Sequence, residues 1–193
     1  MRITDHCAWL HFGAGEETVS ARTVQRLRDI GYRGEIHAVG SGSLESAIGY
    51  RLDPMGVWEE WLIGLKAVVP LLRVQTCLVL RPGYEPTRLP RALGNRMGAD
   101  PVDFCWNGEW VGDEIMGILR RRGLRRRTMR RVSMDSWAIR PAAVETFADL
   151  CVEIRRFLPG DAVTDVGIVC GYAGAMLCGD LEDHRLVGIW EEE

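Results

Sequence analysis

The chain has 193 residues, of which 47% are hydrophobic and 26% are charged, and its formal net charge is −3. This composition excludes a wholly disordered chain, and the net charge argues against a protein that is basic throughout and binds nucleic acid over its whole surface. A chain of this length needs no disulfide or metal to hold a core. It fits a single globular domain over residues 1–193.

The six cysteines are widely spaced and form no C-x-x-C motif. Most lie within apolar runs, where a free cysteine behaves as a small buried hydrophobe. The N-terminal residues lack the apolar segment of a signal peptide, and the longest apolar stretch, Val57 to Leu72, is too short and too charged to span a bilayer. We therefore expect a reduced, cytoplasmic protein that has no membrane contact.

The first third of the chain predicts a strand–helix–strand unit. Residues 8–12 and 35–39 are typical of short strands, and residues 18–30 have apolar positions near helical spacing. Gly31 and Gly34 follow this helix as stop signals. The unit is therefore expected to be βαβ-like, with the two strands parallel.

The next segment predicts two helices and a buried strand. Ser43 is expected to cap a short helix that reaches Tyr50. The clearest helix covers 57–72, with apolar residues at three- and four-residue spacing, and Pro70 should end or kink it. Residues 74–80 follow as a buried strand.

The second half begins with a Pro/Gly-rich loop at about 81–101. The Asn-Gly pair within 103–111 then predicts a β-hairpin with a type I′ turn. A helix is expected over 113–122, extended chain over 128–139, and an amphipathic helix from Pro141 onward. The apolar tail from Val163 to Trp190 predicts two or three antiparallel strands.

These elements predict an α/β protein, with α+β as the alternative class. Strand–helix alternation early in the chain favours parallel strands, whereas the hairpins later in the chain favour antiparallel pairing. A mixed sheet accommodates both patterns. The expected architecture is a mixed sheet with an N-terminal βαβ-like unit, amphipathic helices packed on it, and C-terminal antiparallel strands.

A glycine loop, residues 13–18, lies between the first predicted strand and helix. Gly13, Gly15 and Thr18 there could bind a phosphate, because glycines let the backbone approach it and the helix N-terminus supplies N–H groups. The run Gly13-Ala14-Gly15 through Gly40 resembles the N-terminal βαβ unit of FAD-dependent pyridine-nucleotide reductases, which implies nucleotide binding at this loop. Thr18 stands where that family has its third glycine, and no acidic residue ends the second strand. The alternative is a plain glycine turn in which Glu16 and Glu17 complement the helix dipole.

An arginine-rich segment follows the helix over 113–122. It packs eight arginines into twelve residues, Arg120, Arg121, Arg122, Arg125, Arg126, Arg127, Arg130 and Arg131. Guanidinium groups suit phosphates and carboxylates, so the segment predicts an anionic partner. Aromatic residues do not interleave with it, which disfavours nucleic acid. The alternative is a solvated segment whose charge the protein's own acids compensate.

Trp106 and Trp110 flank the predicted Asn-Gly turn, and this hairpin is our candidate surface for contact with a protein partner. Other sets are weaker candidates. His6, Cys7, His11 and His37 match no standard zinc spacing, so no metal is expected. The carboxylates of Asp103, Glu109, Asp113 and Glu114 could hold magnesium, but Asp113 is more simply explained as a helix N-cap.

Two hypotheses of function follow. The first is a cytoplasmic binding or accessory protein, such as a bacterial immunity or adaptor protein, that uses the arginines and the tryptophan hairpin on an anionic or protein partner. The alternative is a small enzyme that binds a nucleotide or phosphorylated ligand at Gly13–Thr18, with arginines from 120–131 neutralising its charge. No catalytic residues can be assigned, no cofactor other than a nucleotide is expected, and nucleic acid is the less favoured partner.

Overall fold

The computed structural model describes residues 4–13, 15–40, 42–51, 57–86, 104–105, 109–125, 127–129, 131–132, 135–160 and 165–177. The strands are β1 (Thr4–Phe12), β2 (Ile36–Gly40), β3 (Ile48–Arg51), β4 (Val74–Leu80), β5 (Phe104–Cys105) and β6 (Ser136–Ile139). The helices are α1 (Glu17–Asp29), α2 (Val57–Val68), α4 (Asp113–Arg121), α5 (Val144–Arg155) and α7 (Val166–Leu177), with the 3₁₀ turns η1 (Val69–Leu71) and η2 (Pro141–Ala143).

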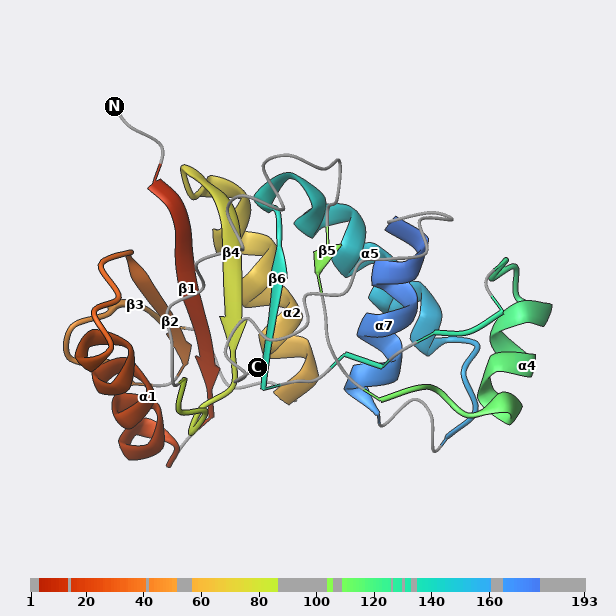
Figure 1. Cartoon of the computed structure of the whole chain (residues 1–193), viewed down its shortest axis with the longest axis horizontal. Coiled ribbons are helices and arrows are strands. Elements are labelled where there is room, and N and C mark those ends of the chain that lie inside the picture. The colour runs from red at the N-terminus through yellow and green to blue at the C-terminus, as the bar shows by residue number, and fades with distance from the viewer. Residues whose placement is uncertain are drawn as a thin grey trace.

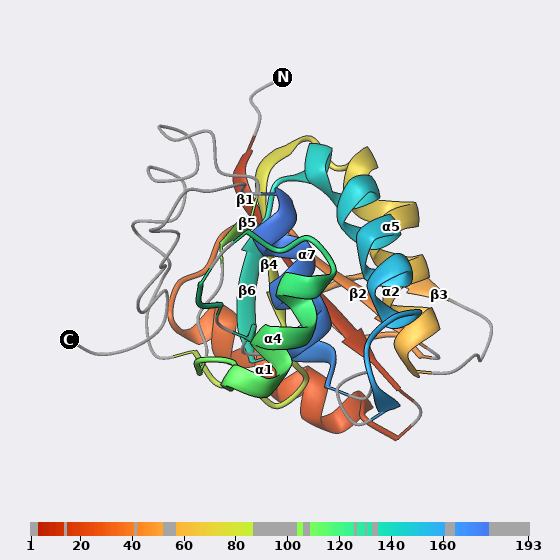
Figure 2. The same cartoon turned by 90° about the vertical axis from the view of Figure 1, so that its right-hand side faces the viewer.

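The described strands form one six-stranded mixed sheet in the order β3-β2-β1-β4-β6-β5. The first four strands are parallel, β6 is antiparallel to β4, and β5 is antiparallel to β6. Helix α1 covers one face, and α2 and α5 cover the other (Figures 1 and 2). The α/β class and the parallel βαβ unit are confirmed.

The direction in which successive strands are added to the sheet reverses at β1. The chain runs outward from β1 to β2 and β3, and α2 then carries it back across to β4 on the other side of β1. In open α/β sheets this reversal leaves a crevice outside the carboxyl ends of the two strands that flank it, here β1 and β4. The glycine loop follows β1 directly, so it lies at this switch point.

The core between the sheet and α2 and α5 is built around aromatic side chains. Trp9, Val79 and Trp137 are register partners on β1, β4 and β6, so their side chains share one face of the sheet. The ring of Trp137 lies 5.7 Å from that of Trp61 on α2 and 5.4 Å from that of Phe147 on α5. These contacts fix both helices on the same face.

The single lysine of the chain joins the two helices on this face. The ammonium group of Lys66, in the last turn of α2, lies 2.6 Å from a carboxylate oxygen of Asp149 on α5. Both side chains are exposed, so the pair contributes little stability. It marks the seam between α2 and α5.

Several predicted elements match the structure. The strand predicted over 74–80 is β4, and the helix predicted over 57–72 is α2 followed by η1, which contains Pro70. Residues 81–86 form the start of the expected loop, and residues 87–101 lie outside the described part. No helix among the described residues has the length and apolar character needed to cross a membrane.

The short helix predicted to reach Tyr50 is wrong, because residues 48–51 form strand β3. This strand pairs in parallel with β2, from His37 opposite Ile48 to Gly40 opposite Arg51. Pairing satisfies the backbone groups along the outer edge of β2, and this long-range gain outweighs the local helix-capping signal at Ser43.

The strands predicted for the tail are also wrong over residues 166–177, which form helix α7. The helix is apolar on nearly every side and is buried, so its sequence lacks the one-sided period that identifies a surface helix. Small residues let it approach its neighbours closely. A Cβ atom at Gly167 would lie 2.5 Å from the backbone oxygen of Val132. The rest of the tail lies outside the described residues.

The hairpin predicted for 103–111 pairs differently from the expectation. Cys105, before the Asn-Gly pair, lies opposite Ala138 on β6. Beyond the pair, Glu109 accepts a backbone hydrogen bond from Arg131, and Val111 donates one to Met129. Both flanks therefore pair with the downstream segment instead of with each other, while residues 106–108, including Trp106, lie outside the described part.

Candidate functional site

The glycine loop at the switch point contains one residue in the left-handed region of the backbone. Gly15 has a φ of +86°, a conformation that suits glycine and strains other residues. A Cβ atom added to Gly15 would meet no heavy atom within 4 Å, and Gly15 and Thr18 are exposed. The structure thus places Gly13, Gly15 and Thr18 between the carboxyl end of β1 and the start of α1.

The donor of this loop is already occupied by a carboxylate of the protein. The backbone N–H of Gly13 donates a hydrogen bond of 2.7 Å to Oε2 of Glu16. Glu16 is the residue before α1 and its side chain is exposed. An incoming phosphate would have to displace this carboxylate, or accept the repulsion between two anions.

The segment after β4 is tied to α1 beside the loop. The N–H of Gly83 donates to Oγ1 of the buried Thr23, at 2.9 Å, and Nε of Arg26 donates to the backbone oxygen of Pro86, at 3.1 Å. At the end of β4, the guanidinium of Arg81 lies 2.8 Å from a carboxylate oxygen of Asp135. Gly83, Arg26 and Arg81 therefore have partners within the protein.

The arginine-rich segment is held to the core by the apolar residues between its arginines. Leu124, Met129 and Val132 are buried. Val132 also donates a backbone hydrogen bond of 2.8 Å to Gly167 of α7. These contacts fix the backbone of the segment, while Arg120, Arg121, Arg122, Arg125, Arg127 and Arg131 are exposed; Arg126 and Arg130 lie outside the described residues.

Three of these arginines make internal contacts, and Nε of Arg120 donates a 3.2 Å hydrogen bond to the backbone oxygen of Met116 in its own helix. The guanidinium of Arg131 pairs with Glu109 at 3.2 Å and with Asp165 at 3.3 Å. The guanidinium of Arg122 lies 5.5 Å from the centre of the Phe157 ring, just after α5, and its backbone oxygen accepts a 3.4 Å hydrogen bond from the Tyr172 hydroxyl. The alternative that the protein's own acids compensate the arginines therefore describes Arg131 well.

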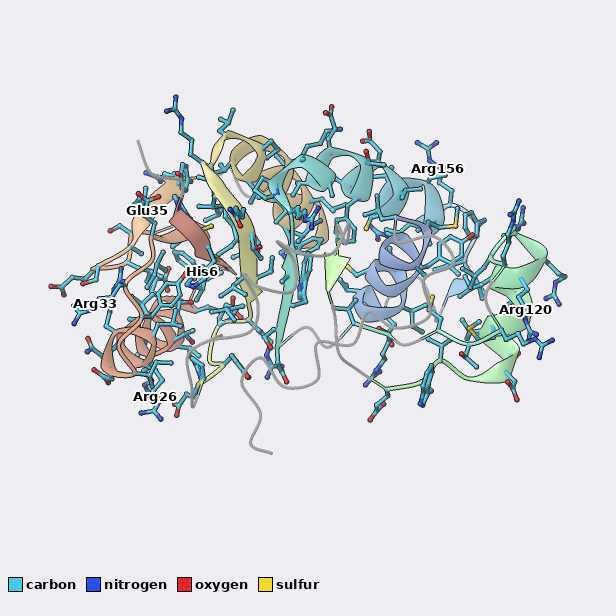
Figure 3. All side chains as sticks on the ribbon, turned by 45° about the horizontal axis from the view of Figure 1, so that its top comes forward. His6, Arg26, Arg33, Glu35, Arg120 and Arg156 are labelled. Atoms are coloured by element: carbon cyan, nitrogen blue, oxygen red, sulfur yellow. The ribbon has the colours of Figure 1, made fainter. Side chains whose placement is uncertain are left out.

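We define the arginine surface as Arg120, Arg121, Arg125 and Arg127 of the arginine-rich segment together with Arg156, which follows α5. Arg120 and Arg121 end α4, and Arg156 caps the C-terminus of α5. The contact between Arg122 and Phe157 joins these two helix ends. Figure 3 shows Arg120 and Arg156 at the same end of the molecule, opposite Arg33 and Glu35. Within the described residues, none of the five forms a salt bridge.

Arg156 was not predicted, because it lies far along the chain from the arginine-rich segment. The packing of α5 against α7, and of both against the end of α4, brings it to the surface. Its position in the last turn region of an amphipathic helix was the available signal, since basic residues favour helix C-termini.

The arginine surface and the glycine loop are too far apart to form one site. The loop lies at the start of α1, whereas α4 lies at the opposite end of the longest axis of the molecule (Figure 1). The hypothesis that arginines from 120–131 neutralise a ligand at Gly13–Thr18 is therefore wrong for the described arginines. The two candidate sites have to be considered separately.

Trp110 lies beside the arginine-rich segment. Its side chain is 53% exposed, and the backbone bonds of Glu109 and Val111 place it next to Met129 and Arg131. No aromatic residue interleaves with the arginines in the sequence, but one lies beside the segment in the folded chain. Strand pairing brings in an indole that is distant in the sequence.

A cluster of polar groups that the sequence did not reveal brings together Glu35, His37 and Tyr50. Nε2 of His37 lies 3.3 Å from a Glu35 carboxylate oxygen, and Nδ1 lies 3.0 Å from the Tyr50 hydroxyl, whose ring is stacked on the imidazole. Burial lowers the pKa of His37, and burial also raises the pKa of Tyr50. A similar stacked pair, His6 and Tyr32, has its Nδ1–Oη distance at 3.1 Å.

The other predicted chemistry does not assemble. Among the described residues, no three metal-ligating side chains come together, so His6, Cys7, His11 and His37 form no metal cluster there. The N-cap of α4 is Gly112 instead of Asp113, which lies with Glu114 in the first turn. Four of the described cysteines, Cys7, Cys77, Cys151 and Cys170, are free and buried, and burial raises the pKa of Cys77 and Cys170.

Comparison with protein-family models and with curated proteins finds no match to this chain.

Proposed function

We propose that the protein is a binding or accessory protein that holds an anionic partner on the arginine surface. The observation that carries this proposal is the gathering of five exposed arginines from α4, the following loop and α5, without a salt bridge in the described part of the chain. A protein that needed these charges only for solubility would gain as much from charges dispersed over its surface. Several cations at one end instead favour an extended anion.

The setting of the surface supports binding. The arginines are anchored by Leu124 and Met129, so their backbone is ordered before a partner arrives, which lowers the entropic cost of association. Trp110 borders the surface and adds a large, partly exposed ring of the type enriched at interfaces. The buried free thiols agree with the proposal that the protein acts in the reducing cytoplasm, as an immunity or adaptor protein would.

Charge reversal tests this proposal on a heparin column, with heparin as the polyanion. The double variant Arg121→Glu/Arg125→Glu should elute at clearly lower salt than the wild type. The matched control is Arg22→Glu/Arg33→Glu, which makes the same change of net charge on exposed residues at the α1 side. Equal elution of the two double variants would show that only net charge matters and would overturn the proposal.

A second candidate function is the binding of a nucleotide or phosphorylated ligand at Gly13, Gly15 and Thr18, as in a small enzyme. Its support is the strand order, which puts the loop at the topological switch point. The Glu16 carboxylate opposes it. Calorimetric titration with ADP tests it, because Glu16→Ala should strengthen binding by freeing the Gly13 N–H, whereas the control Glu45→Ala should not. Absence of binding in both variants would contradict it.

A further inference from the structure

The arginine surface combines two kinds of group that are usually considered apart. Guanidinium groups supply positive charge, and Trp110 supplies a partly exposed indole beside them. A purely acidic polypeptide offers only carboxylates to such a surface. Single-stranded nucleic acids need both, because their phosphates bind cations and their unpaired bases stack on aromatic rings.

The position of Trp110 suits stacking. Two backbone hydrogen bonds, Arg131 N–H to Glu109 at 2.9 Å and Val111 N–H to Met129 at 2.8 Å, hold the chain on either side of it. The backbone is thus fixed while about half of the side chain remains exposed. A ring presented in this way is a preorganised platform. Helix α4 begins three residues later with Asp113 and Glu114 in its first turn, and it carries Arg120 and Arg121 in its last turn.

The arginines near Trp110 come from two different parts of the chain. Arg127 lies two residues before Met129, which is bonded to Val111, and Arg120 and Arg121 end the helix that follows Trp110. Arg122, stacked over Phe157 at 5.5 Å, shows that a guanidinium in this region already packs on an aromatic face. A strand that stacks one base on Trp110 would therefore have cations along its backbone.

We propose that the arginine surface binds single-stranded nucleic acid, with phosphates on its guanidinium groups and a base stacked on Trp110. This inference rests on the proposed function and names the partner class of the same site. A duplex is excluded as the preferred ligand because its bases are already stacked on one another and are not available to the indole. The −3 charge of the whole chain is no obstacle, because the arginines are gathered at one end.

Fluorescence anisotropy tests the inference with three probes, which are a labelled short oligouridine, an RNA duplex of the same length, and labelled polyglutamate. Oligouridine should bind most tightly, with log affinity falling linearly with log salt. Trp110→Ala should weaken oligouridine binding by about 5- to 150-fold, and Trp110→Phe should keep most of it. Arg125→Gln should lower the salt slope by about 0.7, the value for one phosphate contact on a single strand.

The matched control is Ile48→Ala, which shortens an exposed apolar side chain on β3, at the other edge of the sheet, and should leave binding unchanged. Circular dichroism verifies that each variant is folded. Tighter binding of duplex or polyglutamate than of oligouridine, or oligouridine binding that ignores Trp110→Ala, would overturn the inference. In that case a loss of polyanion binding in Arg121→Glu/Arg125→Glu would still support the proposed function, whereas failure of all three probes to bind would overturn both.

Discussion

At the switch point the polar groups of the loops satisfy one another, whereas at the α4–α5 end the cations exceed the nearby acids. The Gly13 N–H is occupied by Glu16, and Arg26 and Thr23 are bonded to the segment after β4. Arg121, Arg125 and Arg156 have no such partner in the described chain. A region whose donors are satisfied internally gains little from a ligand, so the difference supports our proposal that the arginine surface, and not the glycine loop, holds the partner.

The largest expected effect comes from removing an anchor of the arginine-rich segment. Leu124→Ala should lower the free energy of unfolding by about 2–5 kcal/mol, because it leaves a cavity under the segment. Chemical denaturation measures this loss. Leu27→Ala on α1, also a buried leucine, should cost a similar amount but leave heparin affinity intact. If both variants lose affinity equally, the anchoring of the segment has no special role.

The next effect is a pH dependence of the free energy of unfolding, which should not extend to the arginine surface. Burial lowers the pKa of His37 in the folded chain below its ordinary value of 6.5. At a pH between the folded pKa and 6.5, the unfolded chain therefore binds a proton that the folded chain does not. The free energy of unfolding should therefore fall as the pH decreases below about 6.5, by about 1.4 kcal/mol for each unit of pKa depression, and level off below the folded pKa. Arginine keeps its charge throughout this range.

His37→Gln should remove this part of the pH dependence, and it is measured by urea denaturation at a series of pH values. Heparin affinity at each pH should be the same in wild type and variant. If the free energy of unfolding has the same slope against pH in wild type and in His37→Gln, then His37 has the same pKa in the folded chain as in the unfolded chain, which contradicts the prediction.

A smaller effect is expected from Glu16→Gln at the glycine loop. It keeps the size of the side chain but weakens the hydrogen bond from the Gly13 N–H, because the acceptor loses its charge. We expect a loss of about 0.5–1.5 kcal/mol in thermal or chemical denaturation. Glu45→Gln, also exposed, serves as control. An increase in stability would mean that the carboxylate is held there at a cost.

The smallest effect should come from Arg131→Gln. Its two ion pairs, with Glu109 and Asp165, are partly exposed and each contributes about 0.2–1 kcal/mol. Heparin elution should change less than in the single variant Arg121→Gln, because Arg131 is already neutralised. An equal change in the two would contradict the division between paired and unpaired arginines.

The sequence predicted those parts of the fold whose signals are local. Strand β4 has a continuous apolar run, and α2 has a one-sided stripe that ends near Pro70. Helix α7 was missed because it is buried on nearly all sides, and strand β3 because its pairing with β2 is a long-range contact. Periodicity reports how a segment meets water, so it gives no helical signal for a segment that meets almost none.

The same distinction applies to the candidate site. The arginines from 120 to 131 were evident as a charge run, but which of them are neutralised depends on Glu109 and Asp165, which reach Arg131 only in the folded chain. Arg156 and Trp110 join the surface through the packing of α5 and through strand pairing. No spacing rule connects these residues in the sequence.

The seam between α2 and α5 has a practical consequence. Lys66 is the only side-chain amine in the chain, and its hydrogen bond to Asp149 raises its pKa. Acetylation or an amine-reactive dye would therefore modify one known side-chain position and leave every guanidinium charged. Cells that regulate cationic surfaces by acylating lysines would have no such control over this one, and an experimenter gains a single side-chain labelling position that does not alter the charges under test.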